Sequence, residues 1–280
     1  MFEPVTEKQV QTAKNFVLRR EQAANGLATL VDALMEDAAV QIAQICYRYG
    51  VDPKNFSISP TYNSDMFKEI AEVMDILEDE ILDLIGLYAT KCTKDEKKKP
   101  LLLLWILALG KNNKGLRESL EIRLRMFLKD IEAMIVASKL TKYNSSNISG
   151  LIKSYIHTVY QMPGMTAAFK NSSLFKAENI RTKGVKHGNI GSSNSEANNI
   201  LRFAKMTAQM GWMHYYRELF EEQGAVGYYV IRGSQYPCEL CDSKTGFHDI
   251  KDVDGFPMYH ANCCCVAIPV FEKDLESLMQ

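Results

Sequence analysis

Residues 238–265 read CELCDSKTGFHDIKDVDGFPMYHANCCC and hold five of the seven cysteines in this chain of 280 residues. Two thiolates in a tight C-x-x-C turn, here Cys238 and Cys241, can both point at one tetrahedral cation. A second pair of ligands must then come from elsewhere, and His260 with a cysteine of the closing triplet has the spacing of zinc sites. The stretch therefore predicts a small metal knuckle with zinc as its ion.

Three cysteines follow His260, and the direction of the backbone separates them. If an extended strand begins here, Cys263 and Cys265 lie on one face of it and Cys264 lies on the other. The predicted ligands are Cys238, Cys241, His260 and Cys265. Cys263 is the alternative to Cys265. A different interpretation makes the same residues packed thiols, or a disulfide formed outside the cell.

The other features of cysteine usage favour the metal site. Cys46 and Cys92 stand alone in helical stretches, where a free thiol packs as a small hydrophobic group. The odd number of cysteines, the charged N-terminal segment and the single tight cluster argue against a secreted disulfide framework. In a reducing compartment, such a cluster is typical of metal binding.

Two segments beside the cysteine-rich stretch are predicted to be strands. Residues 226–231 and 266–270 are rich in β-branched and aromatic side chains. Large apolar residues are few between 238 and 270, so a core built from this segment alone would be marginal without a metal. The sequence therefore predicts a small α+β C-terminal domain that a zinc knuckle stabilises.

Most of the remaining sequence has the period of a helix, because apolar residues recur at steps of three and four. The predicted helices cover residues 6–49, 65–89, 101–109, 116–140, 148–160 and 197–220. Thr6 and Gln9 form a capping box at the start of the first helix, and Gly26 can bend or split that helix. The fold class is therefore mainly α, with the small α+β domain at its C-terminal end.

The predicted domain boundary falls at the polar run NSSN. It divides the chain into a helical domain over residues 1–145 and a second domain over residues 146–280. Within the second domain, the glycines and small polar side chains of residues 182–195 predict a flexible loop. The knuckle over residues 238–265 completes this domain.

Composition excludes two classes of protein. The longest apolar run, Leu101–Leu109, is too short to cross a bilayer, which needs about 20 helical residues. We predict a short buried helix there and no membrane anchor. The formal net charge is -1, whereas a large nucleic-acid footprint normally requires a basic excess.

The known zinc-enzyme patterns fit this sequence poorly. The segment PCELC matches half of a zinc deaminase signature, but that signature also needs an upstream H-x-E. No upstream histidine has this pattern; they are His157, His187 and His214. An HNH-type nuclease could use His248, His260 and Asn262. A site filled by four protein ligands leaves no position for water, however, so we expect no enzyme activity and no small-molecule substrate.

The order of motifs over about residues 195–270 resembles the C-terminal domain of tailed-phage minor head proteins, the Mu protein F-like head morphogenesis family. The shared order is a helix, Gly224, an aromatic strand, the C-x-x-C turn from Cys238, Gly246, Pro257, the H-x-N-C-x-C run from His260 and a short closing strand. This resemblance covers roughly the last third of the chain.

Two positions depart from the family's pattern: Ala261 replaces a proline, and Cys264 replaces an arginine. The resemblance implies a structural, portal-associated minor protein of a bacteriophage or prophage virion, acting in head morphogenesis or DNA delivery. Its implied partners are portal and capsid proteins, with packaged DNA as a further candidate. Its implied location is inside the head near the portal, after assembly in the host cytoplasm. The alternatives are a zinc-containing HNH-like nuclease and a zinc-knuckle adaptor for protein partners.

Overall fold

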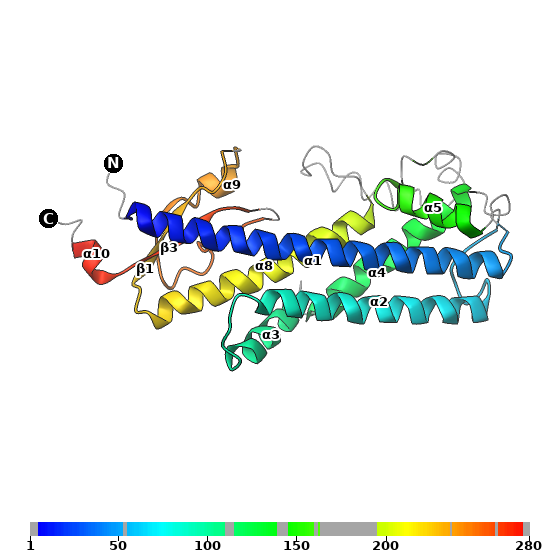
Figure 1. The fold of residues 1–280 in the computed structure, drawn as a ribbon, viewed down its shortest axis with the longest axis horizontal. Helices are drawn as coiled ribbons and strands as arrows, with labels where there is room; N and C mark the ends of the chain where they lie inside the picture. The colour runs from blue at the N-terminus through cyan, green and yellow to red at the C-terminus, as the bar shows by residue number, and fades with distance from the viewer. Residues whose placement is uncertain are drawn as a thin grey trace. The chain divides into compact units, whose positions relative to one another are not determined.

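The computed structural model describes residues 5–52, 55–109, 115–138, 145–159, 162, 195–235, 237–260 and 263–276. It consists mainly of helices, with one small antiparallel sheet near the C-terminal end (Figure 1). The predicted class, mainly α with a small α+β part, is confirmed at this level. Apart from Ser195, the loop predicted over residues 182–195 lies outside the described residues.

The packing of the chain divides it into two compact units. Unit 1 contains Met1–Ala28, Leu84–Leu109 and Phe203–Gln280, and unit 2 contains Thr29–Asp83 and Gly110–Arg202. This division does not follow the predicted boundary between residues 145 and 146, because each unit combines segments from both sides of it.

Six helices follow the predicted periodic segments. They are α1 (Glu7–Arg48), α2 (Ser64–Thr90), α3 (Lys98–Ala108), α4 (Gly115–Ser138), α5 (Ser145–Tyr155) and α8 (Glu196–Glu222). The capping box of α1 is present: the Thr6 amide donates to Gln9 Oε1 at 2.8 Å, and the Gln9 amide donates to Thr6 Oγ1 at 3.3 Å. Helix α5 ends earlier than the predicted Tyr160.

Gly26 neither ends nor splits α1, which is continuous. A Cβ atom at this position would lie 3.3 Å from the ring of Tyr88 on α2, so the glycine serves close packing instead. The structure also corrects the prediction of a buried helix at residues 101–109. Helix α3 buries Leu102 and Ile106 but leaves Leu101 69% exposed, because only one side of this short helix faces the core.

No helix within the described ranges combines the length and the apolar character that crossing a membrane requires.

Helix α4 provides much of the core of unit 2. The apolar residues that recur along it at steps of three and four are buried: Leu120, Leu124, Phe127, Ile131 and Ile135. On its solvent-facing side, Arg125 pairs with Glu121 one turn earlier. The apolar period in the sequence therefore identified which side of α4 faces inward.

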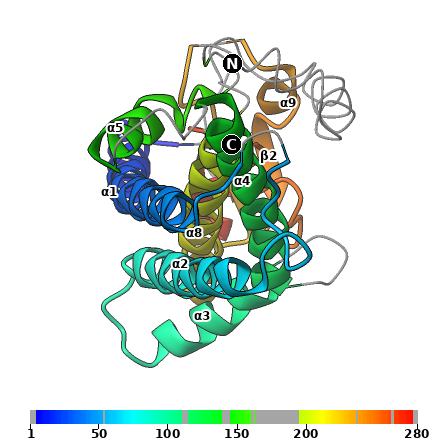
Figure 2. The same cartoon turned by 90° about the vertical axis from the view of Figure 1, so that its right-hand side faces the viewer.

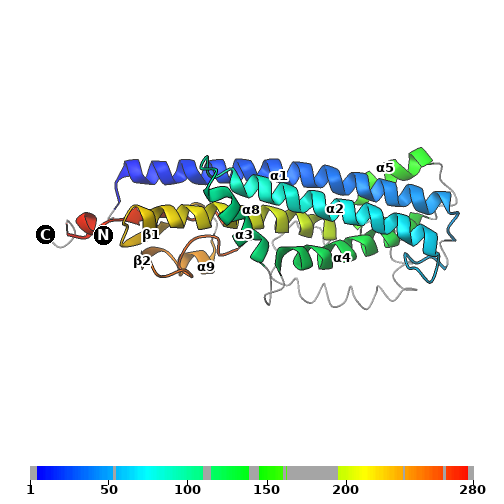
Figure 3. The same cartoon turned by 90° about the horizontal axis from the view of Figure 1, so that it is seen from below.

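The later part of α1 has two neighbours in unit 2. Helix α5 lies beside it (Figure 2), with Lys153 Nζ 3.8 Å from Glu36 Oε2. The first part of α2 runs along it (Figure 3), and the Tyr49 hydroxyl donates to Glu69 Oε1 at 2.7 Å. Polar contacts thus link the later part of α1 to both helices.

Three antiparallel strands form the sheet in the order β2-β1-β3. They are β1 (Gly227–Ile231), β2 (Gly246–Asp249) and β3 (Val266–Val270). In the register of the sheet, Tyr229 of β1 lies opposite Phe247 of β2 and Ile268 of β3. Strands β1 and β3 were predicted, whereas β2 was not. Two short helices, α9 (Glu239–Asp242) and α10 (Glu272–Glu276), complete the C-terminal segment.

The sheet shares its core with helices of unit 1. Tyr228 and Val230 of β1 belong to one buried cluster with Phe16 of α1 and Trp212 and Phe220 of α8. On β3, Val266 and Ile268 pack against Ala13 of α1. The core under the sheet is therefore larger than residues 238–270 alone could provide.

Candidate metal centre

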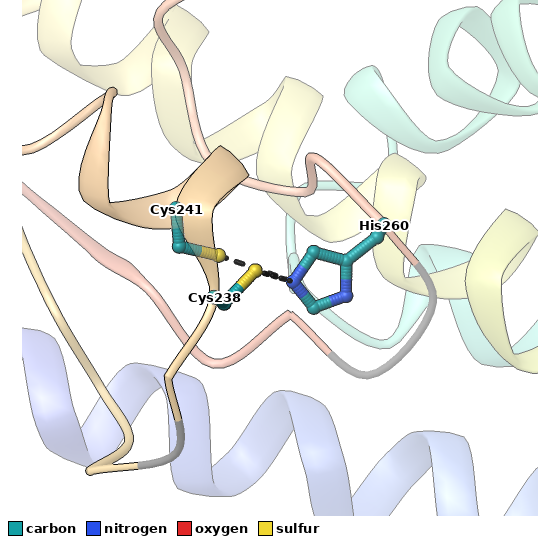
Figure 4. Close-up of side chains that lie close together, drawn as sticks. All are labelled: Cys238, Cys241 and His260. Carbon is teal, nitrogen blue, oxygen red and sulfur yellow. Dashed lines mark hydrogen bonds between the residues drawn. The ribbon is translucent and has the colours of Figure 1, made fainter. Parts of the chain in front are cut away.

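The C-x-x-C segment folds into the single turn of α9, and this turn aims two thiols in one direction. Cys238 precedes the helix and Cys241 lies within it, with the Asp242 amide donating to the Cys238 carbonyl at 2.8 Å. His260 Nε2 lies 3.4 Å from Cys238 Sγ and 3.1 Å from Cys241 Sγ (Figure 4). The imidazole therefore approaches both thiols through one nitrogen, as shared coordination of a cation requires.

A second group of donors joins the first at Cys241. The ligand atoms of Cys241, Cys263 and Cys265 lie within 4.8 Å of one another, and so do those of Cys238, Cys241 and His260. The structure thus brings all five predicted donor residues into one connected cluster. This cluster could hold a metal ion.

The three consecutive cysteines separate as an extended chain predicts. Cys263 and Cys265 are buried, with exposed fractions of 0% and 2%. Among the described residues, Cys264 belongs to neither donor group. Its thiol lies instead in the electrostatic field of Glu21 and Arg20 on α1. Cys264 therefore lies apart from the candidate metal site.

The protein environment prepares some of these thiols to ionise and others to stay protonated. The backbone amide of Cys241 donates to Cys238 and lowers the pKa of that thiol. Burial raises the pKa of Cys241 to about 12. A hydrogen bond to Cys263 raises the pKa of Cys265. A bound cation would replace the protons that Cys241 and Cys265 otherwise keep.

Cys263 has the environment most favourable to a thiolate. A hydrogen bond from Cys265, and further ones from the backbone amides of Cys265, Tyr259 and Met258, lower its pKa to about 4 although burial opposes this. Met258 has a φ of 108°, a value that residues with side chains rarely adopt. The loop before His260 therefore presents its amides to the sulfur in an uncommon backbone conformation.

Two arginines hold the polypeptide around the cluster. Arg20 of α1 is fully buried and donates through Nη2 to the Cys263 carbonyl at 2.7 Å. Arg232 contacts the Cys238 carbonyl at 3.4 Å and pairs with Asp242 of α9. Both guanidinium groups place positive charge beside a cluster that becomes anionic once several thiols ionise.

Sequence reasoning did not find the role of Arg20. This residue is separated from Cys263 by 243 positions, and no motif surrounds it on a helix rich in charged residues. The burial of its side chain indicates this role, and that burial is apparent only from the packing of α1 against the knuckle.

The structure places two residues of the predicted nuclease alternative in separate surroundings. His248 Nδ1 lies 2.8 Å from Asp252 Oδ2, and its Nε2 lies 2.9 Å from the Lys244 carbonyl. Both ring nitrogens of His248 therefore contact oxygen atoms of the protein. His260 belongs to the thiol cluster instead, and Asn262 lies outside the described residues.

Comparisons with protein-family models, with curated proteins and with solved structures find no match, so the chemistry of this centre is argued from its own residues.

Proposed function

We propose that the cysteine-rich cluster binds one structural zinc ion. The observation that carries this proposal is the convergence of four thiols and one imidazole nitrogen, drawn from two separate segments of the chain. Soft thiolate donors combined with imidazole in a four-ligand site favour zinc over the harder divalent cations. The proposed ligands are Cys238, Cys241, His260 and Cys265.

Cys265 is the preferred fourth ligand because of its contacts. Its thiol is hydrogen-bonded to that of Cys241, which belongs to both donor groups. Cys263 receives several backbone amides, which stabilise a thiolate beside the ion without direct coordination. Four protein ligands leave no coordination position for water or substrate, so the proposed ion has a structural role.

We further propose that the chain is a structural minor head protein of a tailed bacteriophage or prophage, associated with the portal. The motif order that resembles the Mu protein F-like family supports this: helix α8, strand β1, the C-x-x-C turn, the H-x-N-C-x-C run and strand β3. Its partners would be portal and capsid proteins, and a rigid knuckle would fix the surface that meets them.

The metal proposal is tested by elemental analysis of protein purified under reducing conditions. One zinc per chain is expected, and cobalt substitution should give the thiolate absorption bands of a tetrahedral site. Cys265→Ser should lose the ion, and Cys263→Ser should keep it with weaker affinity. Retention by Cys265→Ser together with loss by Cys263→Ser would exchange the two roles. A metal-free wild-type chain would refute the site.

The functional proposal is tested by assembly. The purified chain is mixed with the portal protein encoded beside it in the same genome, and the mixture is separated by size and imaged. Co-migration with portal rings is expected. Absence of binding to the portal, or a gene that lies far from portal and terminase genes, would favour the interpretation as a protein-interaction adaptor.

A further inference from the structure

A second group of metal-ligating side chains lies within unit 2. Asp32 and Glu36 are one turn apart on α1, which places their carboxylates on the same side of the helix. His157 follows the end of α5, and its Nε2 lies 2.8 Å from Asp32 Oδ1. The ligand atoms of all three residues lie within 4.8 Å of one another.

Asn198 of α8 fixes the protonation of the His157 ring. Its Nδ2 donates to the His157 carbonyl at 3.2 Å, and a carbonyl can only accept. This orientation places Asn198 Oδ1 3.0 Å from His157 Nδ1. Because Oδ1 is also only an acceptor, Nδ1 must carry the proton. In neutral His157, the lone pair is therefore on Nε2, the nitrogen that faces Asp32.

This arrangement leaves an electrostatic conflict between His157 and Asp32. A lone pair and a carboxylate oxygen 2.8 Å apart repel each other unless a positive charge lies with them. Asp32 Oδ1 is buried and has no hydrogen-bond partner with suitable geometry within the described part of the chain. Either a second proton on the ring or a cation shared by both groups resolves the conflict.

Glu36 favours the cation over the proton. A single proton on Nε2 would satisfy Asp32 but leave a second carboxylate beside it, and the ammonium group of Lys153 is 3.8 Å from Glu36. The Lys153 side chain is 57% exposed, so it is free to move away. A divalent ion balances both carboxylates and uses the Nε2 lone pair.

We propose that Asp32, Glu36 and His157 bind a divalent first-row transition metal, through one oxygen of each carboxylate and Nε2 of the imidazole. The donor set has two hard oxygens and one imidazole, which suits Mn²⁺ or Fe²⁺ better than the thiol cluster does. All three ligands are partly exposed, so water completes the coordination shell. Asn198 acts as the positioning residue, since it orients the ring and fixes its tautomer.

The test uses the full-length, zinc-loaded chain, so that the thiol cluster is already occupied. Mn²⁺ is titrated in, and the signal of free Mn²⁺ is followed by electron paramagnetic resonance. One Mn²⁺ per chain is expected to bind. Asp32→Asn and His157→Gln should abolish binding, and Glu36→Gln, an isosteric change, provides a third variant if either of these folds poorly.

Asp37→Asn is the matched control. Asp37 is adjacent on α1 but is exposed and hydrogen-bonded to Gln41 at 2.7 Å, so its loss should leave Mn²⁺ affinity unchanged. Asn198→Ala should weaken binding by about 10–100-fold, as loss of a residue that orients a metal-bound histidine usually does. Absence of bound Mn²⁺ in the wild-type chain, or equal affinity in the ligand variants, would overturn the proposal and leave a protonated His157–Asp32 ion pair.

Discussion

Strands β1 and β3 and the knuckle between them are neighbours in sequence, but different forces hold them. Tyr228, Val230 and Ile268 of the strands are fully buried. In the knuckle segment, Leu240 is 47% and Val253 59% exposed and Phe256 packs into the core under the sheet, while the thiols of Cys241, Cys263 and Cys265 are buried. Apolar packing therefore stabilises the strands, whereas donor atoms occupy the interior of the knuckle.

This difference indicates where the proposed zinc ion would stabilise the chain. Buried thiols gain little if they remain protonated, and their ionisation in an apolar setting is unfavourable without a cation. The strands depend less on a cation, because large side chains of α1 and α8 pack against them. Removing the ion should therefore loosen residues 238–265 before it affects the sheet.

The largest expected effect comes from removing a thiol that both donor groups share. Cys241→Ser should abolish stoichiometric zinc, whose binding contributes about 10–16 kcal/mol in zinc-finger peptides. Amide hydrogen exchange over residues 238–260 should accelerate strongly, while α4 remains protected.

Cys264→Ser is the matched control for this experiment, because Cys264 lies outside both donor groups. This variant should retain zinc, and its amide hydrogens over residues 238–260 should exchange as slowly as those of the wild type. If Cys241→Ser loses zinc but exchanges like the wild type, the ion does not hold the knuckle.

The converse experiment removes apolar packing and keeps the ligands. Phe220 is 2% exposed, and the centroid of its ring lies 4.5 Å from the ring centroid of Tyr216 and 5.8 Å from that of Phe256. Phe220→Ala should lower the free energy of unfolding by about 3–5 kcal/mol, measured by denaturant titration. Zinc content should stay at one per chain, and loss of zinc would show that the knuckle depends on the core. Leu240→Ala, at an exposed position, should cost about 0.5 kcal/mol or less.

A third change affects the strand and the knuckle together. A Cβ atom at Gly233 would lie 1.6 Å from the Cys264 carbonyl oxygen, so the two backbones must separate in Gly233→Ala. We expect a loss of about 1–3 kcal/mol, the usual cost of overpacking, together with weaker zinc binding in a chelator competition.

Gly150→Ala is the control for this substitution, because nothing lies within 4 Å of a Cβ atom there. As a change within helix α5, it should stabilise the protein by roughly 0.5–1 kcal/mol. Unchanged zinc affinity in Gly233→Ala would mean that this close approach does not support the knuckle.

The smallest expected effect is a dependence on pH at the turn after β2. The hydrogen bond from His248 holds the pKa of Asp252 below its usual 3.8. Because the pKa is lower in the folded state, the ionised carboxylate stabilises the fold. This contribution is complete above the usual pKa of 3.8 and disappears as the pH falls through the folded-state pKa.

Comparing the wild type with Asp252→Asn in denaturant titrations at several pH values isolates this contribution, since zinc release affects both proteins equally. The difference should be below about 1 kcal/mol near pH 7, as for other partly exposed pairs, and should vanish at acidic pH. A difference that stays constant with pH would exclude the ionic contribution.

Sequence patterns were sufficient wherever a local rule determines the structure. The stripe of α4 and the capping box of Thr6 and Gln9 follow from helical spacing and are present in the fold. The donor cluster could also be predicted, because the short turn between Cys238 and Cys241 restricts how two thiols can point. Cys265 was preferred over Cys263 only by its spacing from His260, since both cysteines lie on one face of an extended chain.

Other features depend on contacts between distant segments. Strand β2 has only the sequence GFHD, without an alternating apolar pattern, and it exists because β1 pairs with it. Gly246, with a φ of 118°, starts this strand. The group of Asp32, Glu36 and His157 combines residues more than 100 positions apart, and neither carboxylate forms a recognisable motif.

The hydrogen bond from Arg20 to Cys263 has a consequence for the order of folding during synthesis. At about 5–20 residues per second, a ribosome needs roughly 10–50 s to add the 243 positions that separate them. During this time Phe16 and Ala13 have emerged, but the strands that cover them have not been made. Unit 1 therefore cannot complete its core co-translationally from the N-terminal side. The apolar side of its first helix therefore stays uncovered until the cysteine-rich segment is made.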